Sequence, residues 1–300
     1  MAPSSDHKAF RDILASARRV VILAGAGLSV ASGIPTYRGQ NGLWKTRNST
    51  SFATPEQFRE DPSGIWQFYH CVRERCLKAQ PNAAHLAIAS LVLPSVRSRL
   101  MPSLAENRPP LFITQNFDEL SLRALDSLSD RMTSAEQKLA RERLIETHGS
   151  INRTVCLQCK HINHIIDTPL CPALGGITEA IAGEQVIPVD QLPRCGGAKW
   201  NGANRYGRCG GLLRPAIVWF GEVPEGMGEI AKELNWTDLL IVVGTSSLVH
   251  PAAGFARTVK SRGGKIAVFN LERSEGDENA DFLFLGPCED TVPSILEATY

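Results

Sequence analysis

The sequence predicts an α/β fold in which a buried parallel sheet is joined by a second, smaller lobe. Three short apolar runs, 20–24, 111–114 and 239–243, each lead into glycine or polar residues. Such uninterrupted runs are typical of strands that are buried on both faces of a parallel sheet. A fourth run, 266–269, leads into Asn270 in the same way. A chain of 300 residues that is 43% hydrophobic can bury one large core or two unequal ones.

The first apolar run opens the most informative stretch of the chain, 20–39 (VVILAGAGLSVASGIPTYRG). Gly25, Ala26 and Gly27 follow the run directly, and glycine there lets the backbone turn tightly and approach a bound group. A helix that starts after such a turn points its amides at an anion, so the pattern indicates a phosphate-binding loop. Val30 replaces the third glycine of the dinucleotide fingerprint, and no acid stands about 20 residues further on. These residues alone leave a nucleotide site and a plain strand–turn–helix equally open.

The charge balance argues against a nucleic-acid partner, because 32 Lys and Arg offset 31 Asp and Glu to leave a formal net charge of +1. No apolar run approaches the ~18 residues of a membrane span, so we expect no membrane partner. Residues 1–19 lack the apolar core of a secretory signal, and Asp6 and Asp12 argue against a mitochondrial transit peptide. Phe10 and Leu14 instead favour a first helix packed on the sheet. We expect an intracellular protein, in the cytoplasm, nucleus or mitochondrion.

The region 41–80 differs in composition and is rich in aromatic residues. Thr54-Pro55 and Asp61-Pro62 are helix-start signals within it, so the region predicts short helices that form a lobe beside the phosphate-binding loop. Pro81 precedes another apolar helical pattern over 82–93. Residues 127–144 are rich in charge and in helix formers, which predicts an exposed helix or a flexible excursion.

Polar side chains follow the strand 111–114, namely Gln115, Asn116 and Asp118. Ligands of open α/β sheets bind at the carboxyl ends of the strands, so these groups are candidates for a binding site. A polar helix cap is the alternative. His148 stands before Gly149, and histidine titrates near neutrality, as a general base requires. A structural histidine in a turn is the competing interpretation.

Eight cysteines in a chain of this kind suggest a metal site or free thiols rather than disulfides. Cys156 and Cys159 form a CxxC pair, and thirteen residues separate Cys195 from Cys209. The set fits a tetrahedral zinc site with four thiolates, although the second pair is wider than the usual ribbon spacing. A redox CxxC is the alternative. Three further side chains compete as ligands: Cys171, His161 and His164.

Four stretches, in this order, resemble the sirtuins, the NAD-dependent protein lysine deacylases. They are GAGLSVASGIPTYRG at 25–39, TQNFD at 114–118, HG at 148–149 and GTSS at 244–247. The likeness runs from about Val20 to Cys288. Tyr37 stands where the family usually has Phe, and Phe117 where it usually has Ile or Val, and both replacements keep an apolar body.

The resemblance implies a Rossmann-like NAD-binding domain assembled from residues 1–39, 81–150 and 213–300. The helical insert 40–80 and the zinc-binding module 151–212 would form the smaller lobe. NAD and an acyl-lysine substrate would then meet in the cleft between the two. The segment after residue 215 is expected to return the chain to the large sheet.

The resemblance also implies which residues contact NAD. They are Gly25, Ala26, Gly27, Ser29, Ile34, Pro35, Tyr37, Arg38, Gln115, Asn116, Asp118, Gly244, Thr245, Ser246, Asn270, Glu272 and Cys288. Ile34, Asn116 and Asp118 would border the nicotinamide pocket, and Arg38 would steady the phosphate and the loop. Cys288 would contribute its backbone near adenine, with an ordinary buried thiol as the alternative. In the family's reaction the acyl oxygen attacks ribose C1′ as nicotinamide leaves, and His148 takes a proton from a ribose hydroxyl.

The resemblance selects Cys156, Cys159, Cys195 and Cys209 as the ligands of one structural zinc ion, because the stretch 210–215 (GGLLRP) follows the last of them. Four thiolates leave no open position for substrate. For the substrate peptide, the resemblance implies strand addition along one short segment. Its residues are Val218, Trp219, Phe220, Gly221 and Glu222.

The acyl pocket resembles that of the sirtuin branch that removes succinyl, malonyl and glutaryl groups, but it departs at one position. Ala53 matches the small residue that widens the pocket, and Tyr69 matches one of two groups that hold the acyl carboxylate. The second group is an arginine in that branch and is Val72 here. Arg73 is a candidate replacement, because it lies four residues after Tyr69 and residues at this spacing share a helix face. We therefore expect acetyl, propionyl, butyryl or crotonyl groups to be preferred over succinyl.

Two other classes of function stay open from the sequence. A mono-ADP-ribosyltransferase would share the NAD site but would pass ADP-ribose to a protein side chain. A non-catalytic NAD- or zinc-binding module would have no need of a base at His148.

Overall fold

The computed structural model describes residues 2–36, 53–104, 108–197, 205–245, 254–274 and 276–296. Within these ranges, six parallel strands form a large sheet in the order β3-β2-β1-β7-β8-β9. Their bounds are β1 Val20–Ala24, β2 Leu111–Thr114, β3 Leu144–Glu146, β7 Leu239–Val243, β8 Lys265–Asn270 and β9 Phe282–Leu285. The four apolar runs are therefore strands, as predicted, and β3 and β9 are additions.

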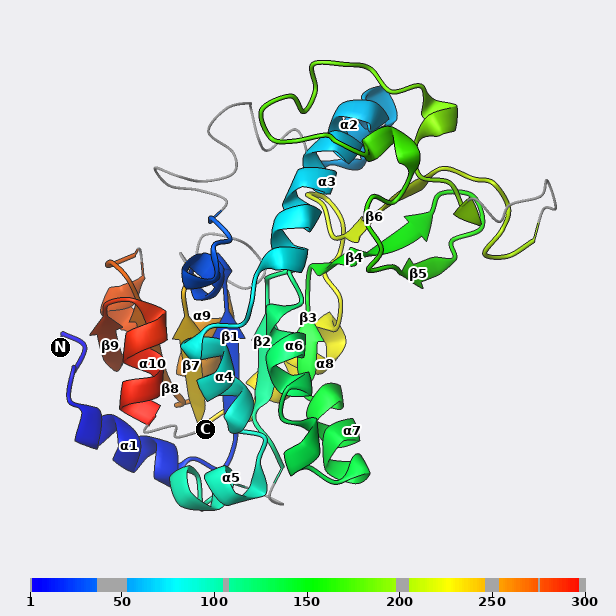
Figure 1. Cartoon of the computed structure of the whole chain (residues 1–300). Helices are drawn as coiled ribbons and strands as arrows, with labels where there is room; N and C mark the ends of the chain where they lie inside the picture. Colours follow the sequence, from blue (N-terminus) through cyan, green and yellow to red (C-terminus); the bar gives the residue numbers. More distant parts are fainter. Residues whose placement is uncertain are drawn as a thin grey trace.

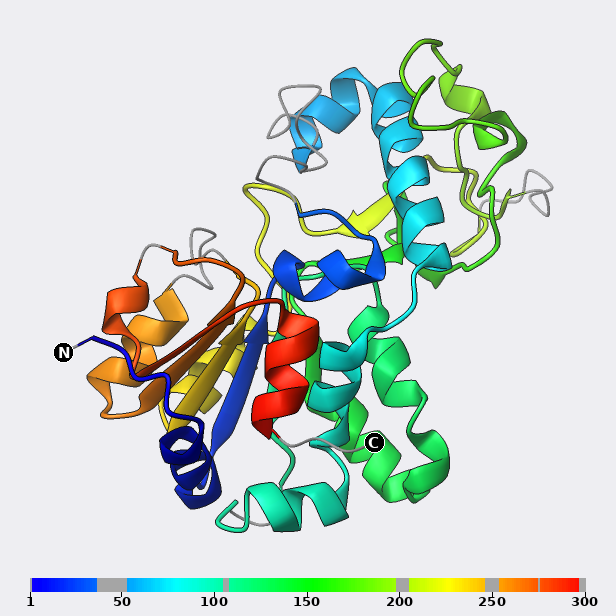
Figure 2. The same ribbon diagram turned by 60° about the vertical axis from the view of Figure 1, so that its left-hand side comes forward.

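Both faces of the large sheet are covered, which explains the unbroken apolar runs. In β1, Val20 and Ile22 face one core and Val21 and Leu23 face another. Figures 1 and 2 show the sheet between two layers of helices. The first layer comprises α1 His7–Ser16, α4 Ala83–Ser90, α5 Pro94–Leu100, α6 Leu120–Asp126, α7 Ser134–Glu142 and α10 Cys288–Leu296. The opposite layer comprises α8 Met227–Leu234 and α9 Phe255–Ser261.

Local signals account for several helix ends. The helix α2 (Pro55–Glu60) begins at Thr54, whose side chain accepts from the Gln57 amide, and α3 (Pro62–Lys78) begins at Asp61 in the same manner. In the segment 127–144, η4 (Ser129–Arg131) and α7 precede β3, so the expected exposed helix is present. The helix after the phosphate-binding loop is a 3₁₀ helix, η1 Ala26–Ser32.

The smaller lobe contains α2, α3 and a three-stranded antiparallel sheet of order β5-β4-β6 (Figure 1). Its strands are β4 Gly149–Cys156, β5 Ile162–His164 and β6 Leu213–Ile217. Two short 3₁₀ helices, η5 Pro172–Leu174 and η6 Val189–Gln191, complete it. One apolar core joins α3 to this sheet, with Trp66, Tyr69 and Ile151 among its buried residues.

The sequence predicts that the chain returns to the large sheet after residue 215, but the structure places the strand at this point in the small sheet. Strand β6 pairs antiparallel with β4, with Leu213 opposite Cys156 and Ile217 opposite Gly149. An apolar strand is compatible with either sheet, and only the partner strand decides between them. Strand β4 crosses the predicted domain boundary at residue 150, and β6 lies in the small sheet although the prediction assigned it to the larger domain. The domain boundaries themselves remain predictions. None of the helices in the described ranges is long and apolar enough to cross a bilayer.

Candidate active site and metal centre

The phosphate-binding loop lies at the carboxyl ends of β1 and β7, where strand order reverses and open α/β sheets bind ligands. Gly25 and Gly27 of this loop are required because the backbone at Gly244 and Thr245 packs closely against them. The Gly27 amide donates to the Gly244 carbonyl at 2.8 Å, and the Gly25 amide donates to the Val243 carbonyl at 2.9 Å. A Cβ at Gly27 would lie 2.7 Å from the Gly244 Cα, and one at Gly25 would lie 2.7 Å from the Thr245 Cβ. The two loops therefore pack backbone against backbone.

A buried polar network joins the loop to the end of β2. Ser29 Oγ donates to Asp118 Oδ2 at 2.7 Å, and Asn116 Nδ2 donates to Ser29 Oγ at 3.1 Å and to the Gly25 carbonyl at 3.0 Å. Burial raises the pKa of Asp118, while the hydrogen bond from Ser29 opposes that rise. The arrangement places amide, hydroxyl and carboxyl groups at one point beside the loop.

His148 lies immediately before β4 and faces the end of β2. Its Nδ1 is 2.8 Å from the Gln115 carbonyl oxygen. A carbonyl only accepts, so the neutral ring carries its proton on Nδ1 and presents Nε2 as a base. Burial lowers the pKa of His148, and the Gln115 hydrogen bond opposes this effect. The neutral imidazole is thus favoured near neutral pH, as a general base requires.

The ends of β2, β7 and β8 are also linked. Thr245 Oγ1 donates to Gln115 Oε1 at 3.2 Å, and Asn270 Nδ2 donates to the Thr245 carbonyl at 3.3 Å. Glu272 is exposed in the following loop. Cys288 begins α10 with its thiol buried, and burial raises the pKa of that thiol to about 11. The Cys288 thiol donates to the Phe269 carbonyl of β8 at 3.9 Å, so an ordinary buried thiol fits this setting.

The remaining residues expected at the NAD site divide into two sets. Ile34 is buried and its amide donates to the Ser29 carbonyl at 3.3 Å, while Pro35 is half-buried next to it. Ala26 opens η1, so its amide has no acceptor within that helix. Such an amide suits a phosphate of NAD. Three predicted contacts lie outside the described residues: Tyr37, Arg38 and Ser246.

The segment 218–222 is fixed by an ion pair that sequence analysis did not single out. Arg214 binds Glu222 through two contacts of 2.6 and 2.8 Å, and its guanidinium lies 3.8 Å from the centre of the Trp219 ring. Glu222 in turn accepts from the Trp219 amide at 2.8 Å. Arg214 was visible only as part of the stretch 210–215. Its position two residues into β6 is what directs it at Glu222.

The same segment joins the two lobes. The Val218 amide donates to the His148 carbonyl at 2.9 Å, and the Phe220 amide donates to the Ala53 carbonyl at 2.8 Å. Phe220 is half exposed, whereas Trp219 is buried. Gly221 has a positive φ of 88° with open space around it. The segment therefore runs between the catalytic candidate and the predicted acyl pocket.

The residues expected at the acyl pocket share one apolar cluster. Ala53, Tyr69, Val72 and Trp219 are all buried within it. Trp219 Nε1 donates to the Tyr69 hydroxyl at 3.0 Å, and burial raises the pKa of that hydroxyl, so it stays protonated. Arg73 is also buried, but its guanidinium donates to the Ile165 carbonyl beyond β5. Val72 thus lies in the same apolar cluster as Tyr69, whereas one nitrogen of the Arg73 guanidinium is engaged by the Ile165 carbonyl.

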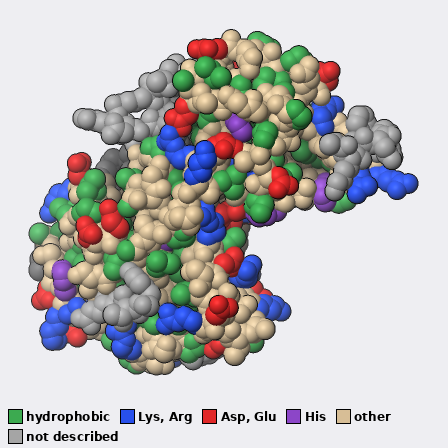
Figure 3. Space-filling model, in the orientation of Figure 1, with side chains coloured by type: hydrophobic (Ala, Val, Ile, Leu, Met, Phe, Trp, Pro, Cys, Tyr) green, Lys and Arg blue, Asp and Glu red, His purple; other side chains and the backbone are tan. Residues whose placement is uncertain are grey.

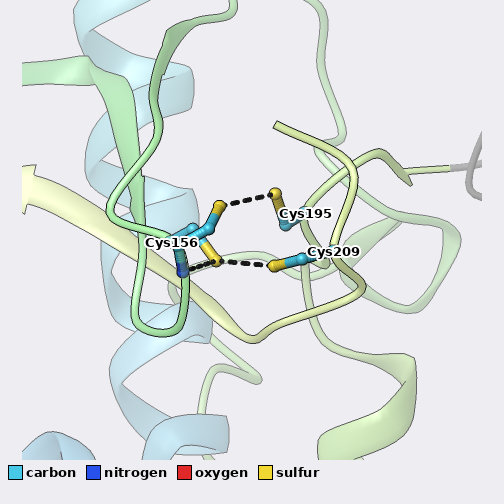
Figure 4. Close-up of side chains that lie close together, drawn as sticks. Cys156, Cys195 and Cys209 are labelled. Atoms are coloured by element: carbon cyan, nitrogen blue, oxygen red, sulfur yellow. Dashed lines mark hydrogen bonds between the residues drawn. The ribbon is translucent and has the colours of Figure 1, made fainter. Parts of the chain in front are cut away.

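Four cysteines converge at the far end of the small sheet (Figure 4). The Sγ atoms of Cys156, Cys159, Cys195 and Cys209 all lie within 4.8 Å of one another, with two separations of 3.4 and 3.8 Å. Zn–S bonds of about 2.3 Å in a tetrahedron place sulfurs at similar separations. A Cβ at Gly211 would lie 2.8 Å from Cys156 Sγ, so this position accepts only glycine.

The environment of the cluster also suits a metal. Backbone amides of Gly207 and His161 lower the pKa of Cys159 to about 6, which favours the thiolate that binds zinc, whereas burial raises the pKa of Cys156 and of Cys195, whose protons metal binding would have to release. The competing ligands lie elsewhere: His164 contacts Glu119, and the His161 ring packs against Tyr206. The cluster has four protein ligands and no place for substrate, as in a structural zinc site.

The fold and site define an NAD-binding α/β protein with a structural zinc module. A family model described as the Sir2 family matches residues 25–251, and the chain belongs to this family. The chain is 41% identical over 298 residues to the mitochondrial NAD-dependent protein deacylase sirtuin-5A of Xenopus laevis, covering 98% of this chain and 86% of that protein.

Two solved structures show the same architecture. A Sir2 homologue in complex with NAD superposes with a TM-score of 0.74 at 29% identity, covering 99% of this chain and 95% of the other. A Sir2 protein in complex with a deacetylated p53 peptide and 3′-O-acetyl ADP-ribose superposes with a TM-score of 0.72 at 26% identity, covering 97% and 98%.

Proposed function

We propose that this protein is an NAD-dependent protein lysine deacylase that transfers the acyl group to ADP-ribose. The observation that carries the proposal is the orientation of His148, whose Nδ1 bonds to Gln115 and whose Nε2 remains available as a base. Bound NAD would supply an activated ribose and a leaving nicotinamide. Asn116 and Asp118 would hold the nicotinamide end, and His148 would accept a proton from the ribose hydroxyl.

The base assignment is tested with His148→Ala. A general base contributes about 10²–10⁴-fold, so turnover should fall at least about 100-fold while ADP-ribose binding largely survives. Mass spectrometry of the products separates the classes of function. O-acyl-ADP-ribose supports the deacylase, and ADP-ribose attached to the protein substrate supports a mono-ADP-ribosyltransferase. Full activity in folded His148→Ala protein contradicts the role given to this residue.

For the acyl group, we infer a preference for uncharged short chains such as acetyl or crotonyl over succinyl. Val72 has no hydrogen-bond donor and packs in the apolar cluster with Tyr69 and Trp219. A buried carboxylate left without a partner there is costly. Nη2 of Arg73 already donates to the Ile165 carbonyl, which argues against Arg73 as the replacement donor, although its buried Nε and Nη1 have no partner in the described structure.

The preference is tested by kcat/KM on matched acetyl-, crotonyl- and succinyl-lysine peptides. A hydrogen bond to a charged group contributes about 1.5–3 kcal/mol, so Val72→Arg should raise the succinyl-to-crotonyl ratio by about 10- to 150-fold. Val72→Met is the matched control, because it lengthens the side chain without a donor. Wild-type protein that favours succinyl about tenfold or more would refute the preference and point to Arg73.

The substrate is proposed to be an acyl-lysine in an extended protein segment, bound along residues 218–222. The support is the peptide complex of the structural relative together with the fixed conformation of this segment and its half-exposed Phe220. We place the protein inside the cell, where NAD and acylated proteins occur, and the name of the Xenopus relative favours the mitochondrion among the compartments considered.

A further inference from the structure

A second buried carboxylate stands directly beside the nicotinamide-facing Asp118. Glu119 is 6% exposed and forms the start of α6. Its backbone has a positive φ of 61°, one of two such non-glycine residues in the described ranges. Residues other than glycine rarely adopt this backbone conformation, and where they do, the surrounding structure must hold them in it.

Three side chains of the smaller lobe hold the Glu119 carboxylate. The Ser150 hydroxyl donates to Oε1, Asn152 Nδ2 donates to Oε2 at 2.8 Å, and His164 Nε2 lies 3.0 and 3.2 Å from the two oxygens. Ser150 and Asn152 are on β4, and His164 is on the edge strand β5. All contacts of this carboxylate therefore cross from the large domain to the small sheet.

Charge supports the same arrangement. Burial by itself raises the pKa of Glu119, but the hydrogen bonds from Asn152, Ser150 and His164 outweigh burial and keep the pKa below its ordinary range. The buried Arg73 guanidinium adds a favourable charge from α3. The carboxylate is thus ionised and firmly partnered at neutral pH.

The position of Glu119 in the chain connects it to both halves of the reaction centre. Asp118 precedes it and accepts from Ser29 in the nicotinamide pocket. Ser150, its partner, is on β4 and lies two residues after His148, which immediately precedes that strand. The Ile151 amide also donates to the Phe117 carbonyl at 2.8 Å, so the two segments run side by side. Any displacement of the Glu119 carboxylate would move Asp118 and His148 relative to each other.

We propose that Glu119 is a positioning residue that sets Asp118 and His148 in register, and that its contact with His164 transmits the placement of the metal-binding module to the reaction centre. The inference rests on the deacylase function proposed above for its kinetic tests. Glu119 touches neither substrate nor the base and acts through the two residues that do.

The key variant is Glu119→Gly, because glycine removes the carboxylate and relieves the positive φ together. If Glu119 served only the backbone turn, this variant would be fully active. We expect instead a fall in kcat of about tenfold or more, since small misplacements of reacting groups are costly. Lys160→Gly is the matched control: Lys160 has a φ of 60° and is exposed, and relief of its backbone should leave activity unchanged.

The His164 contact is tested by a pair of variants. His164→Ala removes the donor and should lower kcat severalfold, whereas His164→Gln keeps an N–H donor and should restore most of it. The ratio of nicotinamide exchange to deacylation provides a readout that simple loss of folded protein does not move. We expect this ratio to rise in Glu119→Gly and His164→Ala, because the proton transfer through His148 follows the departure of nicotinamide. Bound zinc per chain confirms that each variant is folded.

A spectroscopic measurement separates this inference from the proposed function. Long-range ¹H–¹⁵N spectra report the tautomer of each of the seven histidines, and His148→Gln assigns the His148 signal. We expect the Nδ1–H form of His148 in wild type and a mixture of forms in Glu119→Gly. An unchanged tautomer together with an unchanged exchange ratio overturns the inference. A changed tautomer in a protein without deacylase activity supports the positioning role and contradicts the proposed function.

Discussion

Glu146, the last residue of β3, provides a direct test of the electrostatics beside the reaction centre. Its Oε2 accepts from Arg153 Nη2 at 3.1 Å, while its buried Oε1 has no hydrogen-bond partner in the described structure. The side chain is 12% exposed and lines a groove of about 680 Å³ beside this edge strand. Figure 3 shows the surface hollowed on that side, between the two lobes. Burial raises the pKa of Glu146 to about 7, and Arg153 only partly opposes it.

The sign of the effect follows from the neutral form being favoured in the folded state. The contribution of Glu146 to stability is fully present below the ordinary pKa of 4.5 and is lost as pH rises through about 7. Each unit of pKa difference corresponds to about 1.4 kcal/mol, so the rise in the Glu146 pKa from 4.5 to about 7 corresponds to roughly 3 kcal/mol of stability. About 1.4 kcal/mol of that loss falls between about pH 6 and pH 8.5. Glu146→Gln removes the titrating group, so the variant should gain that amount relative to wild type over this interval.

The assay is urea unfolding of the zinc-loaded protein at about pH 6 and pH 8.5, with the free energy of unfolding of wild type subtracted from that of Glu146→Gln. Subtraction cancels the pH dependence of the metal site, which both proteins share. Glu142→Gln is the control, because Glu142 is exposed on α7 near the same groove. A difference that stays constant between the two pH values, or that favours wild type at the higher pH, refutes the assignment of a raised pKa to Glu146.

Two further predictions concern the metal and the loops. Purified protein should contain one zinc per chain, and Cys209→Ala should lose the metal and unfold the smaller lobe, since metal binding there is coupled to folding. Cys171→Ala, outside the cluster, should retain the metal, and zinc-free protein with full stability would contradict the prediction. Gly244→Ala should destabilise the fold by more than the about 1–2 kcal/mol of its positive φ, because a Cβ there would lie 2.4 Å from the Leu28 amide nitrogen. Gly263→Ala has a similar φ and open space, so thermal unfolding that shows equal losses for the two would reject the steric explanation.

The sequence by itself determined the features that depend on local pattern. Val20–Ala24 is an unbroken apolar run because alternate residues face two buried cores. Thr54 and Asp61 indicate helix starts because their side chains accept hydrogen bonds from amides in the first turn of the helix that follows. The four motifs shared with the Sir2 family sufficed to identify the family, while the base and the binding residues that they imply remain predictions. Their order along the chain carried that information without any knowledge of packing.

Only the tertiary structure decided the contacts between distant segments. Gly25 and Gly27 are required by the backbone of Gly244, which the local sequence around them does not reveal. The short strand β3, with three half-buried residues, lacks an apolar run long enough to recognise. Strand β6 joins the small sheet because β4 is its partner, and its apolar pattern fits either sheet. The contact of Glu119 with His164 joins the start of α6 to the edge strand β5, two segments that no periodicity relates, because such pairs are set by the docking of one lobe on the other.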